Sequence, residues 1–159
     1  MKTALYPGTF DPVHNGHLDL LRRAGRVFDR IILGVAHSQP KGTLFALEDR
    51  IAMAREVTVD MDHVQVESFE GLLVDAFEEF GADVVIRGVR LFQDFEYEYQ
   101  MALMNRRLAP RFDVFFLMPS ADFLSVSSTL IKDIHRHGGD VNGLVPPLVA
   151  RRLAEVEGA

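Results

Sequence analysis

The chain alternates between two hydrophobic patterns, and this alternation limits its possible folds more than any other feature. Short apolar runs rich in β-branched residues predict strands at Thr3–Tyr6, Arg30–Ala36, Val64–Glu67, Asp83–Ile86 and Asp113–Met118. Helical spacing predicts helices after Asn15-Gly16 and over Leu47–Val59, Leu72–Phe80, Phe92–Leu108, Ser127–Arg136 and Pro147–Val156. Strand–helix alternation of this kind is typical of a parallel sheet joined by right-handed crossovers. We therefore expect an α/β fold with a single doubly wound, five-stranded parallel sheet.

Composition narrows the class of protein. The 159 residues fit one domain spanning residues 1–159, and the absence of cysteine excludes thiolate metal sites and thiol catalysis. A net charge of −6 argues against a nucleic-acid-binding protein, although a local cluster of cations can still bind a small anion. No apolar run approaches the ~20 residues that span a bilayer, and no signal-peptide core precedes Pro7-Gly8. We expect a cytoplasmic protein with no membrane partner. The chain also lacks the GxGxxG, GxxxxGK[ST] and GxSxG motifs, which disfavours classical NAD binding, P-loop hydrolysis and serine hydrolysis.

Ligands of open parallel sheets bind beyond the carboxyl ends of the strands, so the segments that follow the predicted strands form the candidate site. The first of these ends in His14-Asn15-Gly16-His17, where Asn15 is the expected N-cap of a helix. The first turn of a helix offers free backbone N–H groups and the positive end of the helix dipole, which attract phosphate. The dipole disfavours the charged form of a histidine in that turn. We therefore expect His17 to be a neutral donor to a phosphoryl group.

Three later segments add positive charge or donors to the same edge. Lys41, between Pro40 and Gly42, is predicted to lie on a mobile loop whose ammonium reaches a phosphate. Arg87 and Arg90 follow the fourth strand, and Ser127-Ser128-Thr129 begins a helix after the fifth. Taken singly, each has a simpler interpretation: an exposed lysine, ion-paired arginines and an ordinary helix cap. Their convergence at one edge of the sheet predicts a polyanionic nucleotide ligand.

The predicted helix Phe92–Leu108 leaves two questions open. Its polar stripe either faces water or lines the site beside the arginines, and consists of Asp94, Glu98, Met101 and Asn105. Its large apolar side chains are expected in the core, with a subunit interface as the alternative: Phe92, Phe95, Tyr99 and Met104.

Several ordered motifs resemble a known superfamily. The segment from Tyr6 to Pro12, followed by His14–His17, resembles the first signature of the HxGH nucleotidyltransferases, and Ser127–Lys132 resembles their second, ISSTxxR. Within that superfamily, the family of bacterial phosphopantetheine adenylyltransferases is similar to this chain at Ile86–Arg90, Asp94–Glu98 and Met104–Arg106. The resemblance extends from Tyr6 to about Pro146. The sequence departs from it at His14, where the family commonly has Thr, at Lys132, where the signature has Arg, and at Gly42, where some relatives have a second Lys.

The resemblance implies a Rossmann-like nucleotidyltransferase fold and a reversible adenylyl transfer. ATP and 4′-phosphopantetheine would give dephospho-coenzyme A and pyrophosphate, a step of coenzyme A biosynthesis. The resemblance also implies Mg²⁺ bound with ATP, a homohexamer, and feedback inhibition by coenzyme A. It implies no metal site built from side chains of the protein.

The resemblance further implies roles for individual residues. His17 and Lys41 would be catalytic. The residues implied to bind the acceptor substrate are Thr9, Lys41, Leu73, Arg87 and Asn105. The residues implied to bind ATP are Thr9, Phe10, His17, Gly88, Val89, Arg90, Glu98, Phe123, Leu124, Ser125, Val126, Ser127, Ser128 and Thr129.

Two alternatives remain at this point. The first is another HxGH enzyme, such as a nicotinate-mononucleotide adenylyltransferase or a glycerol-phosphate cytidylyltransferase, which would differ in the acceptor pocket. The second is a non-catalytic nucleotide sensor on the same fold, because fold alone does not decide activity. A substrate panel with ATP and CTP, scored by pyrophosphate release, separates the enzymes from one another. Calorimetric binding of ATP without pyrophosphate formation would indicate the sensor.

Overall fold

The computed structural model describes residues 1–37 and 42–156; Lys41 lies outside the described residues. The strands are β1 (Thr3–Gly8), β2 (Arg30–Ala36), β3 (Val64–Phe69), β4 (Val84–Gly88) and β5 (Val114–Leu117). The helices are α1 (Asn15–Ala24), α2 (Leu47–Val57), α3 (Leu73–Glu79), α4 (Phe92–Leu108), α5 (Ser128–Arg136) and α6 (Pro147–Glu155). A short 3₁₀ turn, η1 (Ala121–Phe123), follows β5 and was not predicted. The predicted α/β fold is confirmed, with every predicted strand and helix present.

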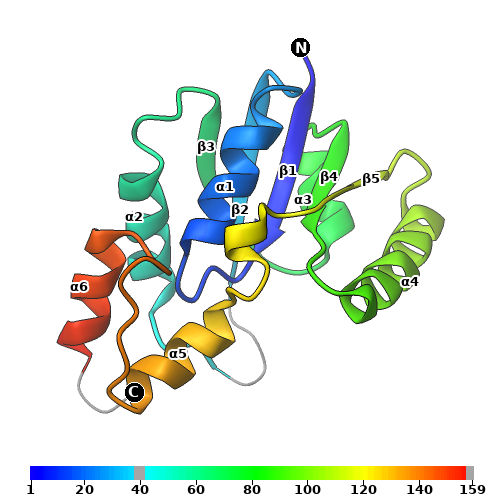
Figure 1. The fold of residues 1–159 in the computed structure, drawn as a ribbon. Coiled ribbons are helices and arrows are strands. Elements are labelled where there is room, and N and C mark those ends of the chain that lie inside the picture. The colour runs from blue at the N-terminus through cyan, green and yellow to red at the C-terminus, as the bar shows by residue number, and fades with distance from the viewer. Residues whose placement is uncertain (38–41, 157–159) are drawn as a thin grey trace.

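The five strands form one parallel sheet in the order β3-β2-β1-β4-β5 (Figure 1). The chain moves outward from β1 to β3, then returns to β4 on the other side of β1, so the order reverses between β1 and β4. In the described residues, β1 pairs with β2 along its whole length but with β4 only at Ala4 and Leu5. Beyond these pairs the two strands separate toward their carboxyl ends. This is the position where open α/β sheets bind ligands.

Two hydrophobic cores cover the two faces of the sheet. Alternate strand residues point to opposite faces. On one face Ala4, Tyr6 and Leu33 pack with apolar residues of α1, α2, α5 and α6. On the other face Leu5, Ile32 and Val85 pack with α3 and with Phe112. The central strands are therefore buried on both sides, which explains their near-continuous apolar sequence.

Two local features differ from the prediction. The N-cap of α1 is His14, with extended backbone angles, and the prediction of Asn15 is wrong. Asn15 is instead the first residue of the helix, and its side-chain Nδ2 donates to the carbonyl of Gly143, 2.8 Å away and 128 residues later in the sequence. Phe28, which continues the helical spacing of α1, lies beyond the helix end but is still buried.

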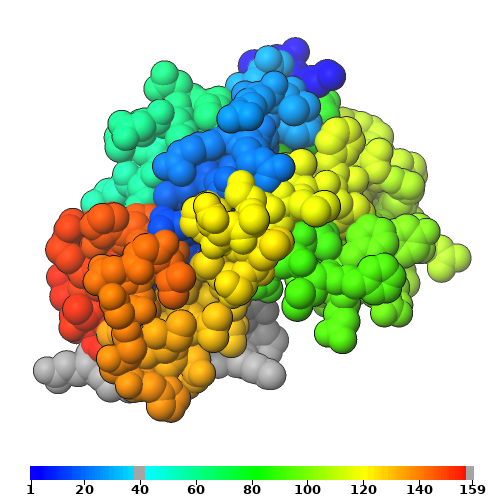
Figure 2. Space-filling view, viewed as in Figure 1, coloured from blue at the N-terminus to red at the C-terminus, as the bar shows by residue number. Residues whose placement is uncertain are grey.

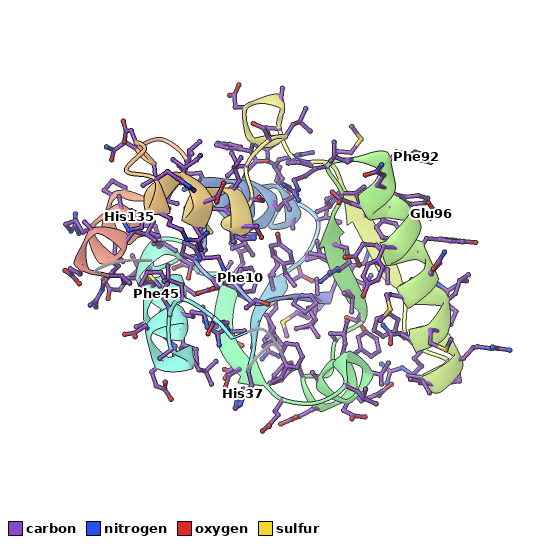
Figure 3. The ribbon with its side chains drawn as sticks, turned by 90° about the horizontal axis from the view of Figure 1, so that it is seen from below. Phe10, His37, Phe45, Phe92, Glu96 and His135 are labelled. Atoms are coloured by element: carbon purple, nitrogen blue, oxygen red, sulfur yellow. The ribbon has the colours of Figure 1, made fainter. Side chains whose placement is uncertain are left out.

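Helix α4 is the largest difference from the prediction. None of its described residues is buried, and Phe92 is 84% exposed, so the prediction that its large apolar side chains belong to the core is wrong. Its apolar residues are spread around the helix rather than gathered in one stripe, and it lies at the β5 edge, away from α1, α2, α5 and α6 (Figure 1). Figure 3 shows Phe92 and Glu96 on this helix, well apart from Phe10.

Among the described helices, none combines the length and the hydropathy that a bilayer crossing requires.

Candidate active site

A cavity of about 240 Å³ opens at the carboxyl ends of β1 and β4, where the two strands separate. It is lined by the end of β1, the first turns of α1, the end of β4, and the segment from Pro119 to Ser128. Figure 2 shows this last segment, in yellow, packed against α1, in blue, with α4, in green, to the right. The charged side chains among its described lining residues are Arg87 and Arg90, and that lining includes no carboxylate. The cavity is therefore suited to an anion.

His17 lies in the first turn of α1 and lines this cavity. Its Nδ1 accepts a hydrogen bond from the backbone N–H of His14, 3.1 Å away. An accepting Nδ1 leaves the proton on Nε2. Burial lowers the pKa of His17 well below its usual 6.5, and the nearby His14 and Arg90 lower it further. His17 is thus a neutral imidazole whose Nε2–H is available to donate, and its donation to a phosphoryl group stays a prediction.

The His14 imidazole stacks on the His17 ring, with the ring centroids 3.5 Å apart and the planes 20° from parallel. Burial, with Arg90 second, lowers the pKa of His14 to about 3, so it is also neutral at pH 7. Its Nδ1 is buried without a hydrogen-bond partner among the described residues. Gly16 makes room for the ring, because a Cβ there would lie 3.0 Å from His14 Cε1.

The Phe10 ring also packs against His17. Its ring meets the His17 ring edge-on at 4.8 Å between centroids and the Tyr6 ring at 5.6 Å. A side chain at Gly8 would collide with it, since a Cβ there would lie 2.9 Å from the Phe10 ring. The backbone of Phe10 has φ +50°, a left-handed conformation that is uncommon outside glycine. Phe10 thus lines the cavity and packs against His17, while its part in binding ATP stays a prediction.

Arg87, near the carboxyl end of β4, and Arg90, just after it, are both held by the protein. Arg87 forms a two-bond pair with Glu98 and donates to the Pro7 carbonyl at 3.0 Å. Arg90 donates to the Val126 carbonyl at 3.0 Å and lies 3.7 Å from the carboxylate of Asp94. Gly88 lies between them in close contact with α1, because a Cβ there would lie 2.6 Å from Leu20 Cδ1 and the leucine side chain would have to move.

The start of α5 forms the opposite wall. Ser127 is the N-cap and accepts from the Leu130 N–H at 3.1 Å, while Ser128 donates to the Pro12 carbonyl at 2.8 Å. The Ser128 proton is used by Pro12, whereas the Ser127 Oγ only accepts, so this wall offers an anion the Ser127 O–H and the backbone N–H groups of the first helical turn. Lys132 pairs with Asp11 at 2.8 Å and is not among the cavity's lining residues.

A second cavity of about 310 Å³ lies between β4, β5 and α4. Its lining includes Leu73 and Asn105, two of the residues implied to bind the acceptor substrate, together with Met101 and Glu98. Glu98 was implied to bind ATP, but the structure places it here rather than in the first cavity's lining. Arg87 lines both cavities and therefore separates them. Three residues of the polar stripe on α4 thus face a cavity, and the fourth, Asp94, faces Arg90.

The other implied ATP-site residues divide into two groups. Gly88, Arg90, Phe123, Val126, Ser127 and Ser128 line the first cavity, as do Phe10 and His17. Thr9, Val89, Leu124, Ser125 and Thr129 are neighbours of lining residues without lining it themselves.

Sequence reasoning missed Arg50 and Asp11. Arg50 lies on α2 with 1% of its surface exposed, and its guanidinium bonds to backbone carbonyls at the edge of the site. Asp11 is 3% exposed. One signal pointed to Arg50: it occupies the apolar face of a predicted helix, three residues after Leu47 and three before Met53.

No described group of three or more His, Asp or Glu side chains could hold a metal ion. The lining of the first cavity agrees with this, since its described residues provide donors and cations rather than carboxylate oxygens.

Comparisons with known proteins assign the chain to a family. Residues 5–134 match the family model described as cytidylyltransferase-like. A phosphopantetheine adenylyltransferase of Thiobacillus denitrificans is 52% identical over 98% of this chain and 97% of its own length. One of Nitratidesulfovibrio vulgaris is 51% identical over 99% of this chain and 84% of its own length. The crystal structure of a candidate nicotinate-nucleotide adenylyltransferase from Vibrio parahaemolyticus superimposes with a TM-score of 0.76 over 98% of this chain and all of its own, at 18% identity, and shares the fold. The relatives are identical to this chain at about half of the aligned positions, and the cavity between β1 and β4 is suited to an anion. The chain therefore belongs to the phosphopantetheine adenylyltransferase family of cytidylyltransferase-like proteins.

Proposed function

We propose that this protein transfers the adenylyl group of ATP to 4′-phosphopantetheine, giving dephospho-coenzyme A and pyrophosphate. The observation that carries the proposal is the first cavity: the neutral Nε2–H of His17, two arginines and two helix N-termini meet where β1 and β4 separate. These are donors for a triphosphate. The names of the relatives that share half of this sequence support the choice of acceptor.

The two cavities divide the substrates between them. ATP occupies the first, with its phosphates at Arg90 and the first turn of α5. The pantetheine arm of the acceptor occupies the second, against Leu73 and Asn105. Arg87 borders both, so the acceptor's phosphate meets the nucleotide there. Because Arg87 is paired with Glu98, binding of that phosphate exchanges one anion for another.

The reaction needs no base from the protein. The nucleophile is a phosphate oxygen of the acceptor, already an anion, which attacks the α-phosphorus of ATP. A new oxygen–phosphorus bond forms, the bond to the bridging α,β-oxygen breaks, and pyrophosphate leaves with the electron pair. Such transfers are accelerated by positioning and charge stabilisation. His17 donates from Nε2 to the α-phosphate oxygens as charge develops there. We assign Lys41 to the incoming phosphate on the sequence resemblance, with Thr9 beside the bridging oxygen.

Mg²⁺ accompanies the nucleotide in this proposal. The described residues form no metal site of their own, which fits an ion held mainly by substrate phosphates and water. It would neutralise charge on the triphosphate, and no residue of this chain is assigned to it.

We also propose a cytoplasmic homohexamer inhibited by coenzyme A. The unburied apolar residues of α4 and β5 support an oligomer, since Phe92, Met104 and Phe115 are 84%, 53% and 47% exposed in a single chain. Coenzyme A carries the same pantetheine arm as the acceptor, so the second cavity would hold it.

The test is the formation of dephospho-coenzyme A by purified protein with ATP, Mg²⁺ and 4′-phosphopantetheine, followed by chromatography and pyrophosphate release. Nicotinate mononucleotide with ATP, and glycerol phosphate with CTP, are the competing substrate pairs. Turnover with either of these pairs and none with phosphopantetheine would refute the acceptor assignment. Binding of ATP in calorimetry without pyrophosphate formation from any pair would indicate a nucleotide sensor.

A further inference from the structure

Phe10 is a strained residue at a functional position. Its φ of +50° lies in the left-handed region, which a bulky non-glycine residue adopts only when its surroundings enforce it. The same conformation brings the ring against His17. Whatever holds the backbone on either side of Phe10 therefore also sets the position of the histidine.

Arg50 holds the residue before Phe10. Its Nη1 donates to the Thr9 carbonyl at 2.7 Å and to the Ala36 carbonyl at 2.8 Å. Longer bonds of 3.3 Å run from Nη2 to His37 and from Nε to Phe45. One guanidinium thus joins the turn after β1, the end of β2 and the residues that lead into α2. Figure 3 shows Phe10 near the centre of the view, with Phe45 beside α2 and His37 below it.

Asp11, the residue after Phe10, is itself held by the bonds of its carboxylate. Its two carboxylate oxygens accept from the backbone N–H groups of Leu44 and Phe45, each at 2.9 Å. One of them also binds Lys132 Nζ at 2.8 Å. Both neighbours of Phe10 are therefore fixed to the chain around Phe45, one by a cation and one by an anion.

The bonds of Arg50 are unusual for a buried charge. Its described acceptors are all backbone carbonyls, and none is a carboxylate. Burying a guanidinium is unfavourable, and replacing a buried charged side chain by an apolar one of similar size often leaves the protein equally stable. Arg50 instead spans several segments that surround the cavity, which an apolar side chain cannot do.

We infer that Arg50 is a positioning residue for adenylyl transfer, which with Asp11 keeps the Thr9–Phe10 turn in its strained conformation and thereby orients His17. This inference rests on the proposed function. Arg50 touches neither the first cavity nor the second and acts through Phe10. A lysine at the same place keeps the charge but not the planar fork that reaches several carbonyls at once.

The experiment compares Arg50→Lys with the unaltered protein in the dephospho-coenzyme A assay. We expect kcat to fall by roughly 10- to 100-fold, because displacing a catalytic group by about 1 Å has effects of this size. The KM for ATP should change by less than about threefold, since Arg90 and the start of α5 are unaffected. The matched control is Phe28→Leu, a core change at the amino end of β2, far from the cavity. The kcat of Phe28→Leu should stay near that of the unaltered protein even if its Tm falls by as much as the Tm of Arg50→Lys.

A second measurement reads the histidine directly. The imidazole ¹⁵N signals of His17 should show a hydrogen-bonded Nδ1 and a protonated Nε2 in the unaltered protein and in Phe28→Leu. In Arg50→Lys they should show a mixture of tautomers. If Arg50→Lys does not fold, Asp11→Asn takes its place with the same expectations, because it weakens the carboxylate bonds that hold the other neighbour of Phe10.

An unchanged kcat with unchanged imidazole signals would overturn the inference, as would an equal loss of kcat in Phe28→Leu at equal Tm. Absence of dephospho-coenzyme A from the unaltered protein would instead refute the proposed function. The ¹⁵N comparison would still decide whether Arg50 orients His17.

Discussion

The stacked histidines predict a loss of stability in mild acid. The folded pKa of His14 is about 3, against 6.5 for an ordinary imidazole. Below pH 6.5 the unfolded chain therefore binds a proton that the folded chain does not. A lowered pKa of this kind contributes stability that is complete above pH 6.5 and is lost progressively as the pH falls toward the folded value.

The magnitude follows from proton linkage. One proton of difference changes the free energy of unfolding by about 1.4 kcal/mol per pH unit. Between pH 7 and pH 5 this amounts to about 2 kcal/mol for His14, and His17, whose pKa is also lowered, adds to it in the same direction. His14→Phe keeps a flat ring on His17 but cannot take up a proton. We expect it to lose about 2 kcal/mol less than the unaltered protein over the same interval.

The assay is urea unfolding at pH 7 and pH 5, with the slope of the denaturant dependence checked for constancy. His137→Gln is the matched control, because it removes an exposed imidazole without touching the buried pair. Comparing the two variants cancels the contribution to the stability change of the carboxylates that titrate in the same pH range. If His14→Phe lost as much stability on acidification as His137→Gln, His14 would not be buried as a neutral group and the reasoning would fail.

Three further predictions concern the site. His17→Ala should lower kcat for dephospho-coenzyme A formation by roughly 10²–10³, the usual effect of removing one charge-stabilising donor, and near-normal pyrophosphate release would remove it from the mechanism. Lys41→Ala should lower turnover while leaving the thermal transition in place, because its neighbours Pro40 and Gly42 predict a loop; calorimetry that showed the transition lost would indicate a structural role. Gly88→Ala should lower Tm and kcat together, because its Cβ would lie 2.6 Å from Leu20 at the wall of the cavity; a crystal structure of the variant with Leu20 unmoved would contradict this.

The sequence by itself determined the order and kind of the elements. Hydrophobic periodicity is a local property, so it identified all five strands, and the alternation with helices required a parallel sheet. Because the strands of a parallel sheet all end on the same edge, the sequence also indicated His17, Arg90 and Ser128 as neighbours, and all three line one cavity.

The tertiary structure alone decided which polar groups meet. A buried hydrogen bond depends on partners far away in the sequence, so no local pattern showed that Arg50 binds the Thr9 carbonyl or that the Glu98 carboxylate pairs with the Arg87 guanidinium. The exposure of α4 was equally hidden, because its apolar residues read the same way in a core or on a surface. Local periodicity specifies which side of an element is apolar, but only the packed chain specifies what lies against it.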